Sequence, residues 1–174
     1  MSKIYTGIGS RSTPIEIKNL MTEIAKILSK KDFTLRSGGA DGADDAFEIG
    51  AIRKEIYLPV KYFNGRIADN QSYFNYQLCE GRDAANEMVE KYHPNPKLLT
   101  KFAFLLMARN SMQVFGRDMK TPTNYVICWT QNGKDIGGTR QAIAIAKDNN
   151  IPVYNLGLSE IHDKFSQWVS EETK

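Results

Sequence analysis

The sequence lacks the features on which several large classes of protein depend. Only two of its 174 residues are cysteines, Cys79 and Cys128, and their separation of 49 positions fits neither a metal site nor a disulfide framework. The longest uninterrupted apolar run, at 102–108, holds seven residues, whereas a membrane span needs about 20. No Gly-Lys-Ser/Thr tripeptide occurs, and the first residues contain no apolar signal core. We therefore expect a cytoplasmic protein with no membrane span, no metal site and no cofactor.

The chain also lacks a large excess of charge of one sign. The formal net charge is +3, and residues 60–123 carry nine Lys and Arg against six Asp and Glu, so the remainder of the chain is balanced. A surplus of this size is below the basic stripe of a dedicated nucleic-acid-binding protein. It favours an anionic small molecule as the partner and leaves weak binding to single-stranded DNA as an alternative.

Strand and helix patterns alternate in the first third of the chain and again in the last third. Helical patterns at 13–31, 43–51 and 140–149 lie beside short apolar strands, and such βαβ repeats require parallel strands with right-handed crossovers. We therefore predict an α/β fold over residues 1–174, a single Rossmann-like domain with a parallel sheet of about five strands and helices on both faces. The predicted strands are 4–8, 33–37, 55–59, 125–129 and 151–156, the last at an edge because it contains a proline.

The first helix has a clear start signal. Thr13 is the expected N-cap, Pro14 the first helical residue and Glu16 the return partner of a capping box.

The middle of the chain, from about 60 to 123, interrupts the alternation, and we predict a helical insertion there without strands. An aromatic stretch at 62–76 precedes two helical patterns at 79–91 and 97–109. The second pattern is apolar on more than one side, as in a helix that is fully buried or shared with a partner. This predicts a homo-oligomer built partly on residues 97–116. The apolar stripe of the tail, Ile161, Phe165, Trp168 and Val169, is expected to cover the last strand.

Three turns repeat one arrangement, in which a strand ends, small residues follow and a helix begins. They are Gly7–Ser12, Ser37–Gly42 and Thr130–Thr139. Parallel strands place such turns along one sheet edge, where helix N-termini and close-lying backbone N–H groups bind phosphates. The alternative is that each is a tight βα turn without a ligand. The candidate ligand-binding residues are Gly7, Gly9, Ser10, Arg11, Ser37, Gly38, Gly39, Asp41, Gly42, Arg109, Asn110, Thr130, Gly137, Gly138 and Thr139.

Three carboxylates follow the second of these turns. Asp41 and Asp44 are suited to capping and charging the start of a helix, and Glu48 lies one turn after Asp44 on the same face. Beside a phosphate site, the same three residues are the candidate catalytic groups of a hydrolase that cleaves the N-glycosidic bond of a nucleotide.

The turn Ser37-Gly38-Gly39-Ala40-Asp41-Gly42-Ala43-Asp44, after an opening Gly7-Ile8-Gly9-Ser10-Arg11, resembles the SLOG superfamily. This superfamily groups the Smf/DprA DNA-processing proteins, the Lonely Guy cytokinin-activating hydrolases and Rossmann-like sensors of nucleotide-derived signals. The runs 108–116, 126–130 and 137–139 are similar to a DprA-like branch frequent in bacteriophage genomes, which would place the protein in the host cytoplasm.

The resemblance implies nucleotide binding at Ser37–Asp44 and a second phosphate turn at Gly137-Gly138-Thr139. The Lonely Guy hydrolases show P-G-G-x-G-T-x-x-E here, whose glutamate is catalytic. This chain has Ile136 in place of the proline, and Arg140, Gln141 and Ala142 follow Thr139, so the catalytic glutamate is absent.

Three functions follow from these observations. The first is binding of a nucleotide or ADP-ribose-like ligand, with Arg11 and Arg109 on the phosphates and the base under residues 60–76, for sensing or sequestering a signalling nucleotide. The second is the nucleotide N-glycoside hydrolase. The third is a DprA-like protein that binds single-stranded DNA through the basic and aromatic residues of 60–123.

Overall fold

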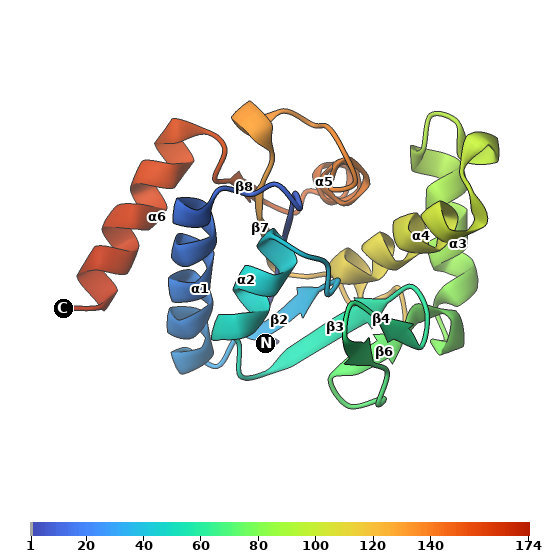
Figure 1. Cartoon of the computed structure of the whole chain (residues 1–174), viewed down its shortest axis with the longest axis horizontal. Helices are drawn as coiled ribbons and strands as arrows, with labels where there is room; N and C mark the ends of the chain where they lie inside the picture. Colours follow the sequence, from blue (N-terminus) through green and yellow to red (C-terminus); the bar gives the residue numbers. More distant parts are fainter. Residues whose placement is uncertain (1) are drawn as a thin grey trace.

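The chain folds around one parallel sheet, as the alternating patterns predict. The structure is a computed structural model that describes residues 2–174. Six strands lie in the order β6-β3-β2-β1-β7-β8, and every neighbouring pair is parallel (Figure 1). The strands are β1 Ile4–Gly9, β2 Thr34–Ser37, β3 Lys54–Leu58, β6 Tyr73–Asn75, β7 Tyr125–Trp129 and β8 Val153–Asn155. The Rossmann-like fold is confirmed, and β8 lies at an edge, as the proline directly before it, Pro152, indicated.

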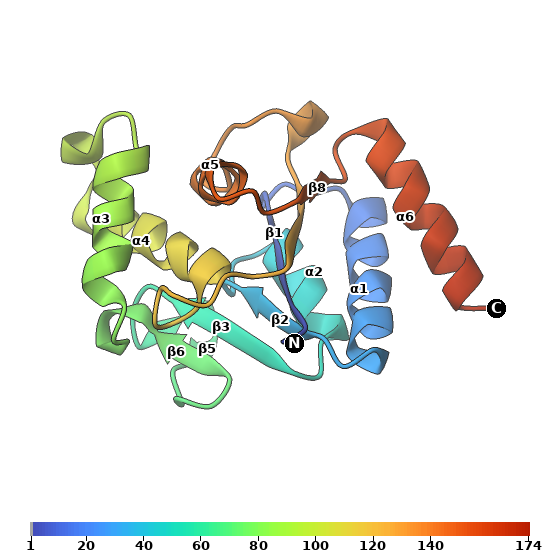
Figure 2. The ribbon, with the colours of Figure 1, turned by 180° about the vertical axis from the view of Figure 1, so that it is seen from behind.

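Helices cover both faces of this sheet. The helices α1 Ile15–Lys30, α2 Ala43–Gly50 and α6 Ser159–Glu172 pack with one hydrophobic cluster, and α3 Arg82–Tyr92, α4 Lys101–Phe115 and α5 Arg140–Asp148 pack with two others. In both ribbon views α6 runs beside α1 at one end of the molecule and α3 beside α4 at the other (Figure 2). No helix in residues 2–174 is long and apolar enough to cross a bilayer.

The middle segment contains strands that the sequence analysis did not predict. Residues Tyr73–Asn75 form β6, which extends the main sheet by pairing with β3, and β4 Tyr62–Phe63 and β5 Arg66–Ile67 form a small antiparallel hairpin. The prediction of an insertion without strands was therefore wrong. Strands of two or three residues with polar neighbours are too short to show an alternation of apolar and polar residues. Residues Tyr73–Asn75 form a strand because the edge of β3 provides their hydrogen bonds.

The predicted capping box at the start of α1 is also wrong. Pro14 has a ψ of 152°, which is extended, so the helix begins one residue later and has no side-chain cap. Thr13 is buried, and its Oγ1 donates a hydrogen bond to the carbonyl of Ser10 at 2.6 Å. The hydroxyl closes the preceding turn and is therefore not available to the helix.

Single-chain packing covers most of the apolar surface of α4 and α6. Helix α4 begins after Thr100, whose Oγ1 accepts from the N–H of Ala103 at 3.1 Å, and it is buried from Ala108 to Val114. Leu98 and Phe102 remain exposed near its start, and a homo-oligomer stays a prediction. The apolar stripe of α6 packs against the core beside β8, as expected, with the ring of Phe165 at 5.8 Å from that of Tyr154.

We predict that the packing of α2 under β1 is a main source of stability. Phe47 is fully buried, and its ring lies so close to Gly7 that a Cβ there would be 2.6 Å from it. Phe47→Ala should lower the free energy of unfolding by about 3–5 kcal/mol, because it leaves a cavity. Ile49→Ala, on the exposed face of α2, is the control and should change it by less than about 0.5 kcal/mol. Equal effects in urea unfolding would contradict the prediction.

Candidate functional site

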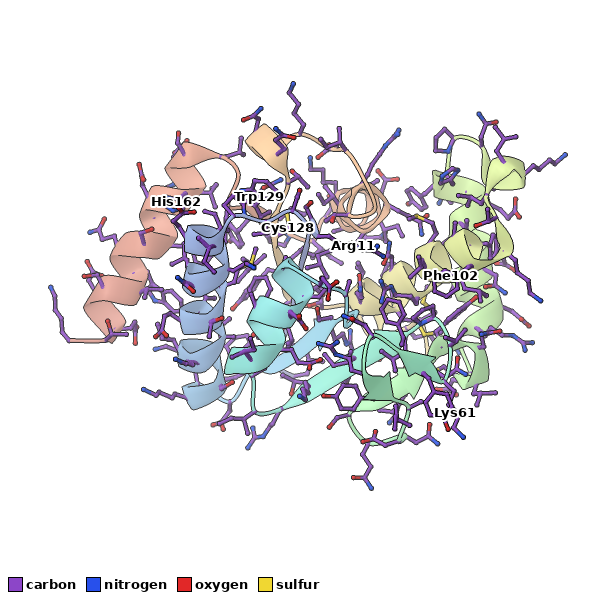
Figure 3. The ribbon with its side chains drawn as sticks, viewed as in Figure 1. Arg11, Lys61, Phe102, Cys128, Trp129 and His162 are labelled. Atoms are coloured by element: carbon purple, nitrogen blue, oxygen red, sulfur yellow. The ribbon has the colours of Figure 1, made fainter. Side chains whose placement is uncertain are left out.

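The three small-residue turns meet around one cavity at the carboxyl edge of the sheet. Its volume is about 440 Å³, and it lies between the ends of β1 and β7, the start of α2, the middle of α4 and the turn before α5. Figure 3 shows Arg11 between α5 and α4. The residues that line it are Ile8, Gly9, Ser10, Arg11, Ser12, Ala40, Asp44, Leu106, Met107, Arg109, Asn110, Gln113, Thr130, Gln131, Ile136, Gly137, Gly138 and Thr139.

Most of the candidate ligand-binding residues line this cavity, and the others lie outside its lining. Ser37 Oγ donates to the carbonyl of Gly7 at 2.6 Å, so both residues hold β1 and β2 together below the turns. The carbonyl of Ser10 accepts from the N–H of Ala43 at 3.3 Å, which joins the first turn to the second. The predicted residues outside the lining are Gly7, Ser37, Gly38, Gly39, Asp41, Gly42 and Glu48.

Glycine is required at Gly42 and Gly38 for different reasons. Gly42 stands at the N-cap of α2 with a φ of 85°, so the prediction of Asp41 as the cap is wrong. Its missing Cβ also leaves room for the carbonyl of Ser10, which would lie 2.5 Å away. A Cβ on Gly38 would meet Gln113 Nε2 at 2.2 Å and Arg109 Nη1 at 2.5 Å, so this glycine lets α4 side chains reach the turn.

Arg109 is a structural anchor of the site as well as part of its wall. The side chain is 5% exposed, and its guanidinium donates to the carbonyls of Gly38 and Tyr57 and to Asn110 Oδ1. Burial lowers its pKa to about 10, and nearby Asp44 opposes that shift, so the guanidinium stays charged at neutral pH. This residue ties α4 to the glycine-rich turn. Because Gly38, Tyr57 and Asn110 already occupy its N–H groups, fewer are left to donate hydrogen bonds to a phosphate, the role predicted for it.

Asp44 is the carboxylate that lines the cavity in the described part of the chain. It is 4% exposed, and its Oδ2 accepts from the N–H of Ala40 at 3.3 Å. Burial raises its pKa to about 6, against the opposing charge of Arg109. Of the three carboxylates considered for hydrolysis, this one is within reach of a ligand in the cavity.

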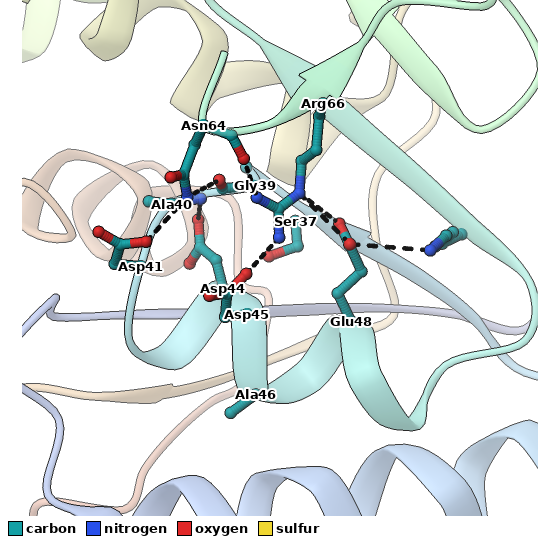
Figure 4. Close-up of polar contacts among 12 residues, drawn as sticks. Ser37, Gly39, Ala40, Asp41, Asp44, Asp45, Ala46, Glu48, Asn64 and Arg66 are labelled. Atoms are coloured by element: carbon teal, nitrogen blue, oxygen red, sulfur yellow. Dashed lines mark hydrogen bonds and ion pairs between the residues drawn. The ribbon is translucent and has the colours of Figure 1, made fainter.

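The other acidic residues serve the β4–β5 hairpin. Arg66 donates to Glu48 at 3.0 Å and forms a short ion pair with Asp45, while Asn64 Nδ2 donates to Asp41 Oδ1 at 2.9 Å (Figure 4). These contacts hold the hairpin against α2 and the turn before it, beside the cavity. Glu48 also pairs with Lys54 at 3.7 Å.

The aromatic stretch predicted to cover a base does not reach the cavity, because no residue of 60–76 lines it. Phe74 and Tyr76 are buried in the core, and Phe63 packs over Arg109 with its ring centroid 5.5 Å from the guanidinium carbon. Among the aromatic residues of this stretch, Tyr62 is the exposed one, with 62% of its surface accessible.

The rim of the cavity is positively charged. Arg11 is exposed, and its guanidinium has no hydrogen-bond or ion-pair partner among residues 2–174. Gly137, Gly138 and Thr139 line the same cavity and precede the N-terminus of α5, whose helix dipole attracts anions. The Asn110 side chain donates to the carbonyl of Gly138 at 2.9 Å and so holds this turn against α4.

The sequence patterns indicate Arg109 and Asn110 of α4, and the structure adds Leu106 and Gln113 of the same helix to the cavity lining. Leu106, Arg109 and Gln113 recur at helical spacing and therefore share the face that points at the cavity. A helical wheel through Arg109 would have identified Gln113. Ser12, Met107, Gln131 and Ile136 also line the cavity, from the turns and helix already singled out.

Comparison with known proteins shows similarity of fold. No protein-family model and no curated protein matches the sequence. Among solved structures, DNA processing protein A from Helicobacter pylori matches with a TM-score of 0.56 and 17% identity, over 98% of this chain and 79% of that chain. That structure is described in terms of its binding to single-stranded DNA.

We predict that the buried carboxyl of Asp44 destabilises the fold as pH rises. Its pKa is about 6 when folded against 3.8 as the ordinary value, so between these pH values the unfolded state releases a proton that the folded state keeps. The stability of the wild type relative to Asp44→Asn should therefore fall by about 2 kcal/mol from pH 4 to pH 7. Urea unfolding at several pH values measures this difference. Parallel profiles for the two proteins would contradict it, and Asp41→Asn, at an exposed site, is the control.

Proposed function

We propose that the protein binds single-stranded DNA and that one nucleotide of the strand occupies the cavity, with its phosphate on the rim. The observation that carries this proposal is that the unpartnered guanidinium of Arg11 and the turn at the N-terminus of α5 line the same cavity. The fold shared with DNA processing protein A from Helicobacter pylori supports DNA as the source of the nucleotide.

The rim has the chemistry that a phosphate needs. A guanidinium gives charge-assisted hydrogen bonds to phosphate oxygens, and the turn Gly137–Thr139 adds backbone N–H groups at the positive end of a helix. The hydroxyls of Ser10 and Ser12 lie 2.8 Å apart at the same mouth and can donate to a further oxygen.

A strand leaving the cavity has a second surface to follow. Lys61 and Lys101 form no ion pair within residues 2–174, and each is next in sequence to an exposed aromatic residue, Tyr62 or Phe102. Figure 3 shows Lys61 and Phe102 on the side of the molecule where α4 begins. Phe102 also contacts Phe63, which covers Arg109, so aromatic packing continues from this surface to the cavity wall. Bases stack on such side chains without regard to sequence.

A free nucleotide is the second candidate, and the cavity itself favours it. A volume of about 440 Å³ falls within the ~300–1,000 Å³ typical of small-molecule sites. The modest net charge of +3 also suits a small anion. Nucleotides incubated with the protein and analysed by chromatography would test hydrolysis at the same time: release of free base that Asp44→Asn abolishes would favour the hydrolase.

We predict that Arg11→Ala weakens binding to an unstructured single strand of about 30 nucleotides by about 10-fold to 100-fold, because one charge-assisted contact to phosphate is lost. Fluorescence anisotropy at about 50 and 200 mM salt measures both the affinity and its salt dependence, whose slope should become shallower by about 0.7.

Arg53→Ala is the matched control for this experiment. It removes the same charge from an exposed arginine at the opposite edge of the sheet, where Arg53 pairs with Asp32 at 3.1 Å. It should leave the affinity within about twofold. Equal losses in the two variants, or equal affinity for a duplex of the same sequence, would refute a site for single strands at the cavity.

A further inference from the structure

Three buried polar side chains form the floor of the cavity, and each has hydrogen-bonding capacity left over. Asp44, Arg109 and Gln113 are each at least 95% buried and line the cavity. Within residues 2–174, no hydrogen bond reaches Arg109 Nη2 or the side-chain amide of Gln113, and the Asp44 carboxylate, which accepts from the backbone N–H groups of Ala40 and Gly38, has acceptor sites left over. A folded chain rarely leaves so many buried polar groups without a partner.

These open groups are accessible from the cavity. Among the described residues, only the hydroxyl of Tyr5 and Gln141 Oε1 are sealed from solvent without a partner. The unpartnered atoms of the floor are therefore not sealed, and the cavity is the space that they line. A ligand that enters the cavity can satisfy them.

The floor is unsuited to a phosphate group. Asp44 is the acceptor there, and with a pKa of about 6 it is mostly ionised at pH 7.5, so it would repel an anion. Leu106, Met107 and Ile136 add apolar wall on the side of α4 and the turn before α5. A flat group with apolar faces and a polar edge, which is the description of a nucleobase, fits a cavity with such walls and such a floor.

The order of donors and acceptors distinguishes among the bases. The missing Cβ of Gly38 lets Gln113 Nε2 lie beside the Arg109 guanidinium, whose Nη1 is bonded to the carbonyls of Gly38 and Tyr57 while its Nη2 has no partner within residues 2–174. The charge of Asp44 lies close enough to Arg109 to influence its pKa. The floor therefore presents donors next to an anionic acceptor. Guanine has the complementary edge, since its O6 accepts while the adjacent N1–H and N2–H both donate. Adenine and cytosine would place a ring-nitrogen lone pair where a donor is needed.

We propose that this floor selects guanine, with Asp44 accepting from N1–H and N2–H and with Arg109 or Gln113 donating to O6. The proposal rests on the binding of a nucleotide at the cavity and adds which base enters. Asp44 is then the specificity-determining residue, and the rim residues hold the phosphate of the same nucleotide.

The test compares thymine-rich single strands that differ at one central base, which is guanine, hypoxanthine or adenine. Hypoxanthine lacks only the N2 amine of guanine, so the wild type should bind the guanine strand about tenfold more tightly than the hypoxanthine strand. Guanosine, inosine and xanthosine monophosphates, measured by calorimetry, provide the same comparison for the free nucleotide.

Asp44→Asn provides a readout that a merely structural role would not change. The asparagine amide can donate to the O2 of xanthine, so this variant should lose its preference for guanosine monophosphate and bind xanthosine monophosphate more tightly than the wild type does. Gln113→Leu, which keeps Asp44, should weaken binding of every base that has an O6 acceptor, and it serves as the second variant if Asp44→Asn does not fold.

The outcomes separate the two proposals. Tight binding of all three strands with equal affinity would overturn guanine selection and leave single-strand binding in place. Absence of binding to every strand and every monophosphate would overturn both. A guanine preference that Asp44→Asn leaves intact would show that another group reads the base and would overturn the role of Asp44.

Discussion

The buried guanidinium of Arg109 is the interaction on which the arrangement of the site depends. Three different parts of the chain meet on it: the carbonyl of Gly38 after β2, the carbonyl of Tyr57 in β3 and the side chain of Asn110 in α4. Removing a guanidinium from water is costly, and the cost is recovered only if its N–H groups find acceptors at fixed positions. The requirement works in both directions, since α4 can approach the sheet only where those carbonyls are free.

The free carbonyls follow from the glycine-rich turn. A residue with a Cβ at Gly38 would collide with both Arg109 and Gln113, and the positive φ of Gly42 turns the chain into α2. Once the turn has this shape, Asp44 comes to lie next to Arg109 inside the protein. The two charges then compensate each other in part, which keeps an ionisable carboxyl at the bottom of a cavity that is otherwise built of backbone, amides and apolar side chains.

The charged groups around Arg109 differ between the floor of the cavity, its rim and the surface outside it. Partly compensated polar groups lie at the floor, and the unpartnered Arg11 and the start of α5 lie at the rim. The ion pairs of Arg66 with Asp45 and Glu48 lie outside the cavity and hold the β4–β5 hairpin. Asp44 and Asp45 are adjacent in the sequence but have different roles, because the helix directs Asp44 toward the cavity and Asp45 toward Arg66.

Local sequence patterns predict the alternating α/β architecture, the edge of the sheet where the turns gather and most residues of the cavity, among them Arg11, Asn110 and Thr139. These features depend on local periodicity and on small residues at strand ends, which are visible without distant contacts. Contacts in the folded protein are needed to see that β6 is a strand and that Thr13 closes a turn instead of capping α1. They also show that Glu48 pairs with the hairpin while Gln113 lines the cavity. Each of these depends on a partner at least three positions away and in most cases in another element, and the free energy of such a contact is absent from any local pattern.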